Sequence, residues 1–222
     1  MHLSDAVLAT SDAGRIVLGA GMVLAAGATA VGLRKMDYER MPRVAVLSSA
    51  FFVASLIHVE PFGVSIHLVL NGLMGLILGW AAVPAILVAL LLQAALFQFG
   101  GLLAVGVNTL VMGLPAVVCY YLFHRGVRDP RKGVALAVAV AAAVTAVMLA
   151  SLLCALALHL SGENLAGLGR LVLLANLPVA AIDAMVTASV VMFLRQVSPE
   201  VLDALPAIPV PGETPHACAH DS

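Results

Sequence analysis

The first two residues of the chain, Met1 and His2, carry the donor atoms of a metal chelate. The Met1 amine and the backbone nitrogen of His2 can close a five-membered ring around one ion. The same backbone nitrogen and the Nδ1 atom of the His2 ring can close a six-membered ring. The alternative is that His2 is simply the second residue of a frayed terminus.

We expect this terminus to be kept with a free amine. Residues 1–13 contain two aspartates and no lysine or arginine, so they lack the basic region that opens a signal peptide. Removal of the first methionine usually requires a small second residue, and histidine is large. The start of the chain is therefore a candidate metal-binding site.

Two further histidines, His58 and His67, could add ligands to this chelate. A fourth nitrogen from His67 would complete a plane, and a planar nitrogen set suits Ni(II) or Cu(II) and accepts Co(II), whereas zinc prefers a tetrahedron. Asn71 lies four residues after His67 and would share its helical face. The alternatives are an interfacial histidine at position 58 and a helix-packing histidine at position 67.

The composition is that of a polytopic membrane protein. Of the 222 residues 62% are hydrophobic and only 10% are charged, compared with about 25% charged residues in soluble domains. Residues 44–59, 61–124 and 133–162 contain no charged residue, and about 20 apolar residues suffice to cross a bilayer as a helix. The alternation typical of a membrane β-barrel is missing. The fold class we predict is all-α.

The remaining composition excludes several functions. A net charge of −1 without a basic stripe does not indicate nucleic-acid binding. No CxxC pair is present, so neither a zinc ribbon nor a redox pair is indicated. Cys119 and Cys154 lie in apolar segments and are predicted to be small core residues.

Apolar runs between breakers predict about seven transmembrane helices. They cover residues 14–33, 44–58, 66–80, 82–99, 102–123, 133–159 and 171–194. The second and third are short for a full crossing and flank the loop of residues 59–64, so they could stop short and line a cavity.

Basic residues predict the orientation of the bundle. Nine of the eleven lysines and arginines follow the first, fifth and seventh spans. By the positive-inside rule these loops face the cytoplasm, and an odd number of spans then puts the N-terminus outside. His2 and the ends of the second and third spans, with His58 and His67, would meet at the outer face. Residues 1–195 are predicted to form the membrane domain, and the proline-rich residues 196–222 a mobile cytoplasmic tail.

Polar side chains inside the predicted spans require an explanation, because they are costly in lipid. Asp183 is the one acidic residue deep in a predicted span. It could orient a ligand or form a polar contact with another subunit. The tail also ends in a short Cys/His tract, residues 216–221, for which the alternatives are metal binding and a solvated tail without function.

Four stretches of the sequence resemble the CbiM/NikM family, the metal-capturing membrane component of energy-coupling-factor importers for cobalt and nickel. They are MHLSD at residues 1–5, AFFVAS through SIHL at residues 50–68, QAALFQFGGL with GVNTLVMG at residues 93–113, and NLP through Asp183 to SPE at residues 176–200. The likeness covers nearly the whole chain except about the last 20 residues. Ala6 replaces the usual glycine of the family, and Asp183 replaces the usual glutamate.

The resemblance implies a ligand set and a role. It implies that Met1, His2 and His67 bind Ni(II) or Co(II) as a transported substrate, with no catalytic residue and no catalytic cofactor. Candidate supporting residues around these ligands are His58, Ser65, Asn71, Asn108 and Asp183. The choice between nickel and cobalt stays open.

The resemblance also implies partners. Family members sit in the bacterial plasma membrane beside a scaffold membrane subunit and two cytoplasmic ATP-binding cassette ATPase subunits, and some systems use a small auxiliary membrane subunit. This chain has no P-loop motif, so the partners would supply the energy.

Two other functions stay open. One is a membrane-embedded metalloenzyme that uses His58, His67 and Asp183, although no HExxH motif occurs. The other is a transporter driven by an ion gradient, although intramembrane acidic pairs and an internal repeat are not evident.

Overall fold

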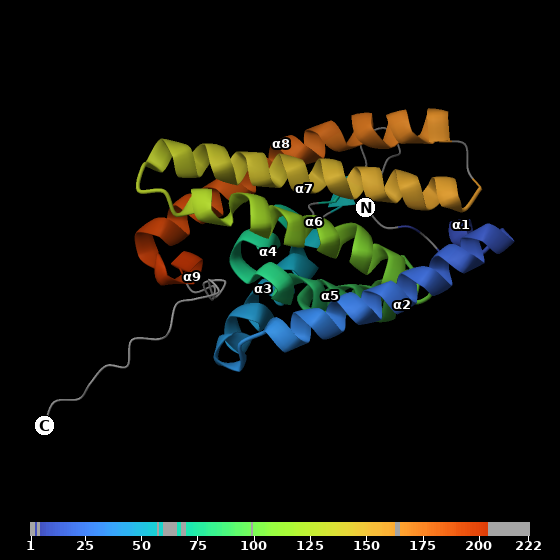
Figure 1. The fold of residues 1–222 in the computed structure, drawn as a ribbon. Coiled ribbons are helices and arrows are strands. Elements are labelled where there is room, and N and C mark those ends of the chain that lie inside the picture. Colours follow the sequence, from blue (N-terminus) through green and yellow to red (C-terminus); the bar gives the residue numbers. More distant parts are fainter. Residues whose placement is uncertain are drawn as a thin grey trace, which may run out of the picture.

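The computed structural model describes residues 3, 5–56, 58–59, 66–67, 70–98, 100–162 and 165–203. Across these ranges the chain forms a helical bundle with one short two-stranded ladder (Figure 1). The elements are α1 (Asp5–Leu8), α2 (Asp12–Lys35), η1 (Tyr38–Arg40), α3 (Met41–Leu56), β1 (His58–Val59), β2 (Ile66–His67), α4 (Asn71–Leu78), η3 (Gly79–Ala81), α5 (Ala82–Phe97), α6 (Val105–Val127), α7 (Lys132–Leu160), α8 (Leu165–Val197) and α9 (Glu200–Asp203).

Five helical stretches are long and apolar enough to cross a membrane. They are Asp12–Lys35, Asn71–Phe97, Val105–Val127, Lys132–Leu160 and Asn176–Val197. The prediction of a multi-pass helical membrane protein is therefore confirmed, whereas the predicted count of about seven is not. The predicted second span corresponds to α3, whose 16 residues fall short of the roughly 20 that a crossing needs.

The predicted third and fourth spans form one apolar stretch that is broken in the middle. Gly79 has φ +56° and ends α4, and a 3-10 turn leads into α5. Gly75 lies against Ala116 of α6 and Gly79 against Tyr120, but Val83 lies back against Gly113. The chain therefore reverses at Gly79, and α4 and α5 run in opposite directions beside α6. Each is too short to span a bilayer alone.

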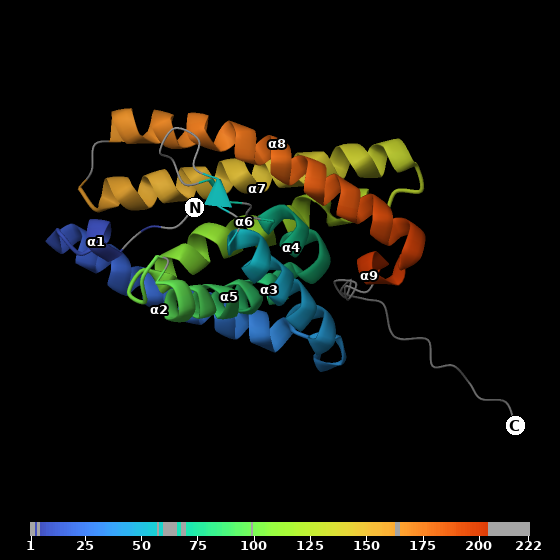
Figure 2. The same ribbon diagram turned by 180° about the vertical axis from the view of Figure 1, so that it is seen from behind.

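The bundle has two ends that differ in chemistry. At the first, the N-terminal end, the Ser11 hydroxyl donates to the Ser161 carbonyl over 2.7 Å and ties the start of α2 to the end of α7. At the other, the α9 end, the Arg195 guanidinium donates to the carbonyls of Val127 (2.5 Å) and Asp129 (2.7 Å). Figures 1 and 2 show α7 and α8 side by side along most of their length, which joins the two ends.

Short α9 closes the second end. It packs against α4 and α8, and Arg128 donates to the Leu202 carbonyl over 2.8 Å. The C-terminal ends of α2, α6 and α8 lie at this end (Figure 2), and each of these helices has basic residues in its last turn. The orientation of this end in the membrane and the boundary of the tail stay predictions, and residues 204–222 lie outside the described residues.

Small and apolar side chains fill the interior. Cys119 and Cys154 are buried, which confirms their prediction as core residues. Interior positions of α7 are mostly alanines, which allow α6 and α8 to approach its backbone closely.

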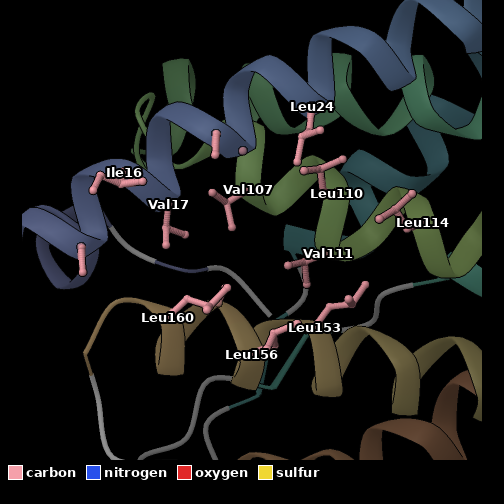
Figure 3. A pocket seen from close by; sticks show the side chains of 14 residues that line it. Ile16, Val17, Leu24, Val107, Leu110, Val111, Leu114, Leu153, Leu156 and Leu160 are labelled. Atoms are coloured by element: carbon pink, nitrogen blue, oxygen red, sulfur yellow. The ribbon is translucent and has the colours of Figure 1, made fainter.

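An apolar groove of about 500 Å³ lies between α2, α6 and α7 (Figure 3). Ile16 and Leu24 of α2 face Leu110 of α6 and Leu156 of α7 across it. Its lining consists of carbon side chains, which provide no ligand atoms for an ion. This groove is therefore not a candidate metal centre.

Candidate metal centre

Asn108 holds the start of the chain inside the bundle. The Leu3 amide donates to Asn108 Oδ1 over 2.9 Å, and Asn108 Nδ2 donates to the Leu3 carbonyl over 3.1 Å. Leu3 and Asn108 are both buried. The residue that directly follows His2 therefore has a fixed backbone against α6, a single peptide unit of about 3.8 Å from the predicted ligand.

Asp5 makes a second attachment, on the loop between α5 and α6. Its carboxylate accepts from the amides of Leu103 (3.2 Å) and Ala104 (2.6 Å), and its own amide donates to the Gly100 carbonyl over 3.2 Å. A carboxylate at the start of α6 is stabilised by the free amides and by the helix dipole. Leu3 and Asp5 thus fix the chain on both sides of residue 4.

Gly101 makes room for this attachment. It has φ +80°, and a Cβ on it would lie 2.0 Å from the Asp5 carboxylate. Only glycine meets both conditions without strain. The sequence signal for this arrangement was a glycine pair ahead of a helix and an acidic residue near the start of the chain, and its meaning becomes clear only in the fold.

The two predicted histidine positions lie opposite each other in the ladder of β1 and β2. The strands are antiparallel, and His58 is the register partner of His67. Directly opposed residues of an antiparallel pair have Cα atoms about 4.5–5.5 Å apart. The ladder therefore brings two positions nine residues apart to one place, beside α3 and α8.

Asp183 of α8 fixes the junction between β2 and α4. Its Oδ1 atom accepts from the Leu70 amide over 2.9 Å, and Leu70 has the left-handed conformation with φ 48°. A leucine in this conformation is strained and needs support from its surroundings. Asp183 and Asn71 are fully buried. The position three residues after His67 is thus held by a side chain from α8.

Gln93 and Ser55 join α5 to α3 just before the ladder. Gln93 Nε2 donates to the Ser55 hydroxyl, and about two turns further away the Ser48 hydroxyl donates to the Ala85 carbonyl over 2.8 Å. These bonds show that α3 and α5 run parallel. They position the end of α3, from which the chain enters β1.

The predicted site residues fall into three groups. Met1, His2 and Ser65 lie outside the described residues, and His58 and His67 are described by their backbone alone. Asn71, Asn108 and Asp183 are placed as above. Within the described ranges no cluster of three or more His, Cys, Asp or Glu side chains occurs. The ligand set itself stays a prediction.

Comparison with solved structures identifies the fold. A crystal structure of a transition metal transporter matches with a TM-score of 0.69 at 24% identity and covers 90% of this chain and 95% of that one. A truncated transition metal transporter matches with a TM-score of 0.57 at 21% identity. This chain therefore has the fold of these two structures.

The sequence then gives the family. Residues 2–201 match the family described as CbiM, cobalt uptake substrate-specific transmembrane region, so the chain belongs to that family of metal transport components. A putative metal transport protein of Haemophilus influenzae is 44% identical over 207 residues, which are 91% of this chain and 97% of that protein. The cobalt transport protein CbiM of Sorangium cellulosum is 31% identical over 94% of this chain and 97% of its own length. A fused nickel transport protein NikMN of Rhodobacter capsulatus is 39% identical over 43% of this chain and 30% of its own length.

Proposed function

We propose that this protein is the substrate-capture component of an ATP-driven importer of Ni(II) or Co(II). The ion binds at the outer face through the Met1 amine, the backbone nitrogen and ring of His2, and the ring of His67. Family membership and relatives named for cobalt and nickel transport support the choice of metals.

The observation that carries the proposal is the attachment of Leu3 to Asn108. A chelating terminus binds tightly only where its donors are held in place, since ordering a free terminus costs conformational entropy. The two hydrogen bonds to the backbone of Leu3 order this segment when the protein folds, so metal binding does not have to order it. His67 lies in the ladder of β1 and β2. Three residues further on, the Leu70 amide donates to Asp183 of α8.

Partner subunits supply the energy in this proposal. A scaffold membrane subunit and two ATP-binding cassette ATPases drive release of the ion to the cytoplasm, with a small auxiliary membrane subunit where the system has one. The basic α9 end faces the cytoplasm by the positive-inside rule, which points the N-terminal end outward.

The variant Asn108→Ala tests whether the attachment of Leu3 to Asn108 supports metal binding. Leaving the buried Leu3 amide and carbonyl unpaired is expected to loosen the terminus and to weaken Ni(II) or Co(II) binding by about 10–100-fold. Calorimetric titration of the purified protein measures this. The matched control is Thr109→Val on the same helix, because that hydroxyl bonds only to Val105 of its own helix. Equal affinities for the two variants would contradict the proposed role of Asn108.

Binding is expected to weaken steeply as the pH falls. The amine, the His2 backbone nitrogen and the two imidazoles bind the ion only without their protons, so binding releases protons. Each proton released at a given pH lowers the apparent affinity about tenfold per pH unit on acidification. Titrations with Ni(II) between about pH 8 and pH 6 measure the slope. A pH-independent affinity would overturn this ligand set.

A further inference from the structure

Four polar atoms are left without a hydrogen-bond partner where α4 meets α8. They are Asn71 Oδ1 and Nδ2, Asp183 Oδ2 and Thr187 Oγ1, and no residue in the described part of the chain satisfies them. All three side chains are fully buried. Buried polar atoms nearly always have a partner, and an unpaired one indicates a bound water or ion.

The three side chains belong to one corner of the fold. Asp183 and Thr187 are four residues apart on α8 and share a face. Asn71 follows Leu70, whose amide donates to the other oxygen of the Asp183 carboxylate. The corner lies deep in the bundle, because the neighbouring Gly72 packs against Ala142 and Ala143 in the middle of α7.

Among the described residues, the three helices α4, α7 and α8 place no lysine or arginine beside Asp183. The sequences of α4 and of α8 from residue 171 to residue 194 contain no lysine or arginine, and α7 contains none after Lys132. The amino end of α4, which points at the carboxylate, offsets part of its charge. A carboxylate in such a place requires a counter-charge.

We propose that Asn71, Asp183 and Thr187 bind one monovalent metal cation, of the sodium or potassium class. Carboxylate, amide and hydroxyl oxygens form a hard donor set, and one carboxylate neutralises one positive charge. The backbone supports this, because α4 starts in the bundle interior directly after Leu70, which has φ 48°, and interrupted membrane helices are where alkali cations bind. The amide nitrogen of Asn71 donates to a water that completes the coordination.

This site differs in chemistry from the proposed nitrogen site for the transported ion. It uses oxygen donors alone, and its occupancy does not require the terminal amine. It would fix the Leu70 turn, three residues from His67, by holding α4 and α8 together. A test without Ni(II) or Co(II) therefore separates it from the proposed transport function.

The test is the thermal midpoint of the purified protein in chlorides of equal ionic strength. Sodium or potassium chloride is expected to raise the midpoint by about 3–5 °C over choline chloride, because the cation binds the folded state alone. Asp183→Asn and Thr187→Val should each abolish the difference. Thr109→Val, which removes an equally buried but already bonded hydroxyl, should keep it.

Two outcomes overturn the proposal. Equal midpoints of the unaltered protein in sodium, potassium and choline chloride would mean that water or a proton satisfies these atoms. A cation effect that persists in Thr187→Val and in Asp183→Asn would place the cation elsewhere. If Asp183→Asn fails to fold, Thr187→Val alone decides, since it keeps the carboxylate and the contact with Leu70.

Discussion

An acetyl group or a tag of several residues ahead of Met1 is expected to abolish tight binding of Ni(II) or Co(II). The addition removes the free amine of Met1, and with it the five-membered chelate ring, and leaves only the six-membered ring between the His2 backbone nitrogen and Nδ1. The affinity should fall by several orders of magnitude, well beyond the roughly 10–100-fold typical of a lost outer-shell partner. Equilibrium titration of the purified protein with each ion measures the loss.

The control for this experiment removes the block again. A chain that carries a cleavable extension should bind weakly, and proteolytic release of Met1 with its free amine should restore the original affinity. The same extension after Ser222 should have no effect. Binding that survives an extension or an acetyl group at the N-terminus would contradict the proposed ligand set and would favour a metalloenzyme with an internal site. Metal uptake that persists without the ATPases would favour an ion-gradient transporter.

Replacement of His67 by alanine is the second change with a large expected effect. It removes the fourth nitrogen of the proposed plane, so the affinity for Ni(II) should fall by more than about 100-fold. The absorption band of a planar nitrogen-ligated ion should disappear with it. Visible spectroscopy and calorimetry of the variant measure both quantities.

His159→Ala is the matched control, because this histidine is exposed in the last turn of α7, at the same end of the bundle. It should bind like the unaltered protein. His58→Ala shows whether the register partner of His67 is a ligand or only a neighbour. Unchanged affinity and spectrum in His67→Ala would refute the role of His67.

The helices could be predicted because apolar runs in a lipid environment leave few alternatives. The predicted ranges of residues 133–159 and 171–194 lie within α7 and α8. The predicted start of α6, residue 102, was early because Gly100 and Gly101 have positive φ, and the helix begins only at Val105. The count of about seven is not confirmed, because α3, α4 and α5, which correspond to the predicted second, third and fourth spans, are each shorter than a full crossing, and a glycine with positive φ, Gly79, separates α4 from α5.

The site could be predicted only in part, because its residues are joined by contacts between distant segments. Asn108 was recognised as a polar residue in a span, but its partner is the backbone of Leu3, and backbone atoms carry no sequence signal. Asp183 likewise bonds to a backbone amide, that of Leu70. The ladder that pairs His58 with His67 has only two residues in each strand, too few for a periodic pattern.

The contact between Leu3 and Asn108 also determines when the terminus can take its place during synthesis. The two residues are 105 positions apart, so the segment around Leu3 can dock only after α6 has been synthesised. At about 5–20 residues per second this delay lasts roughly 5–20 s, during which the segment around Leu3 is unanchored. The Leu70–Asp183 bond, 113 positions apart, forms later still. Nascent chains that stop before α8 would therefore lack the hydrogen bond that supports Leu70, and the proposed capture site would be complete only in the fully synthesised protein.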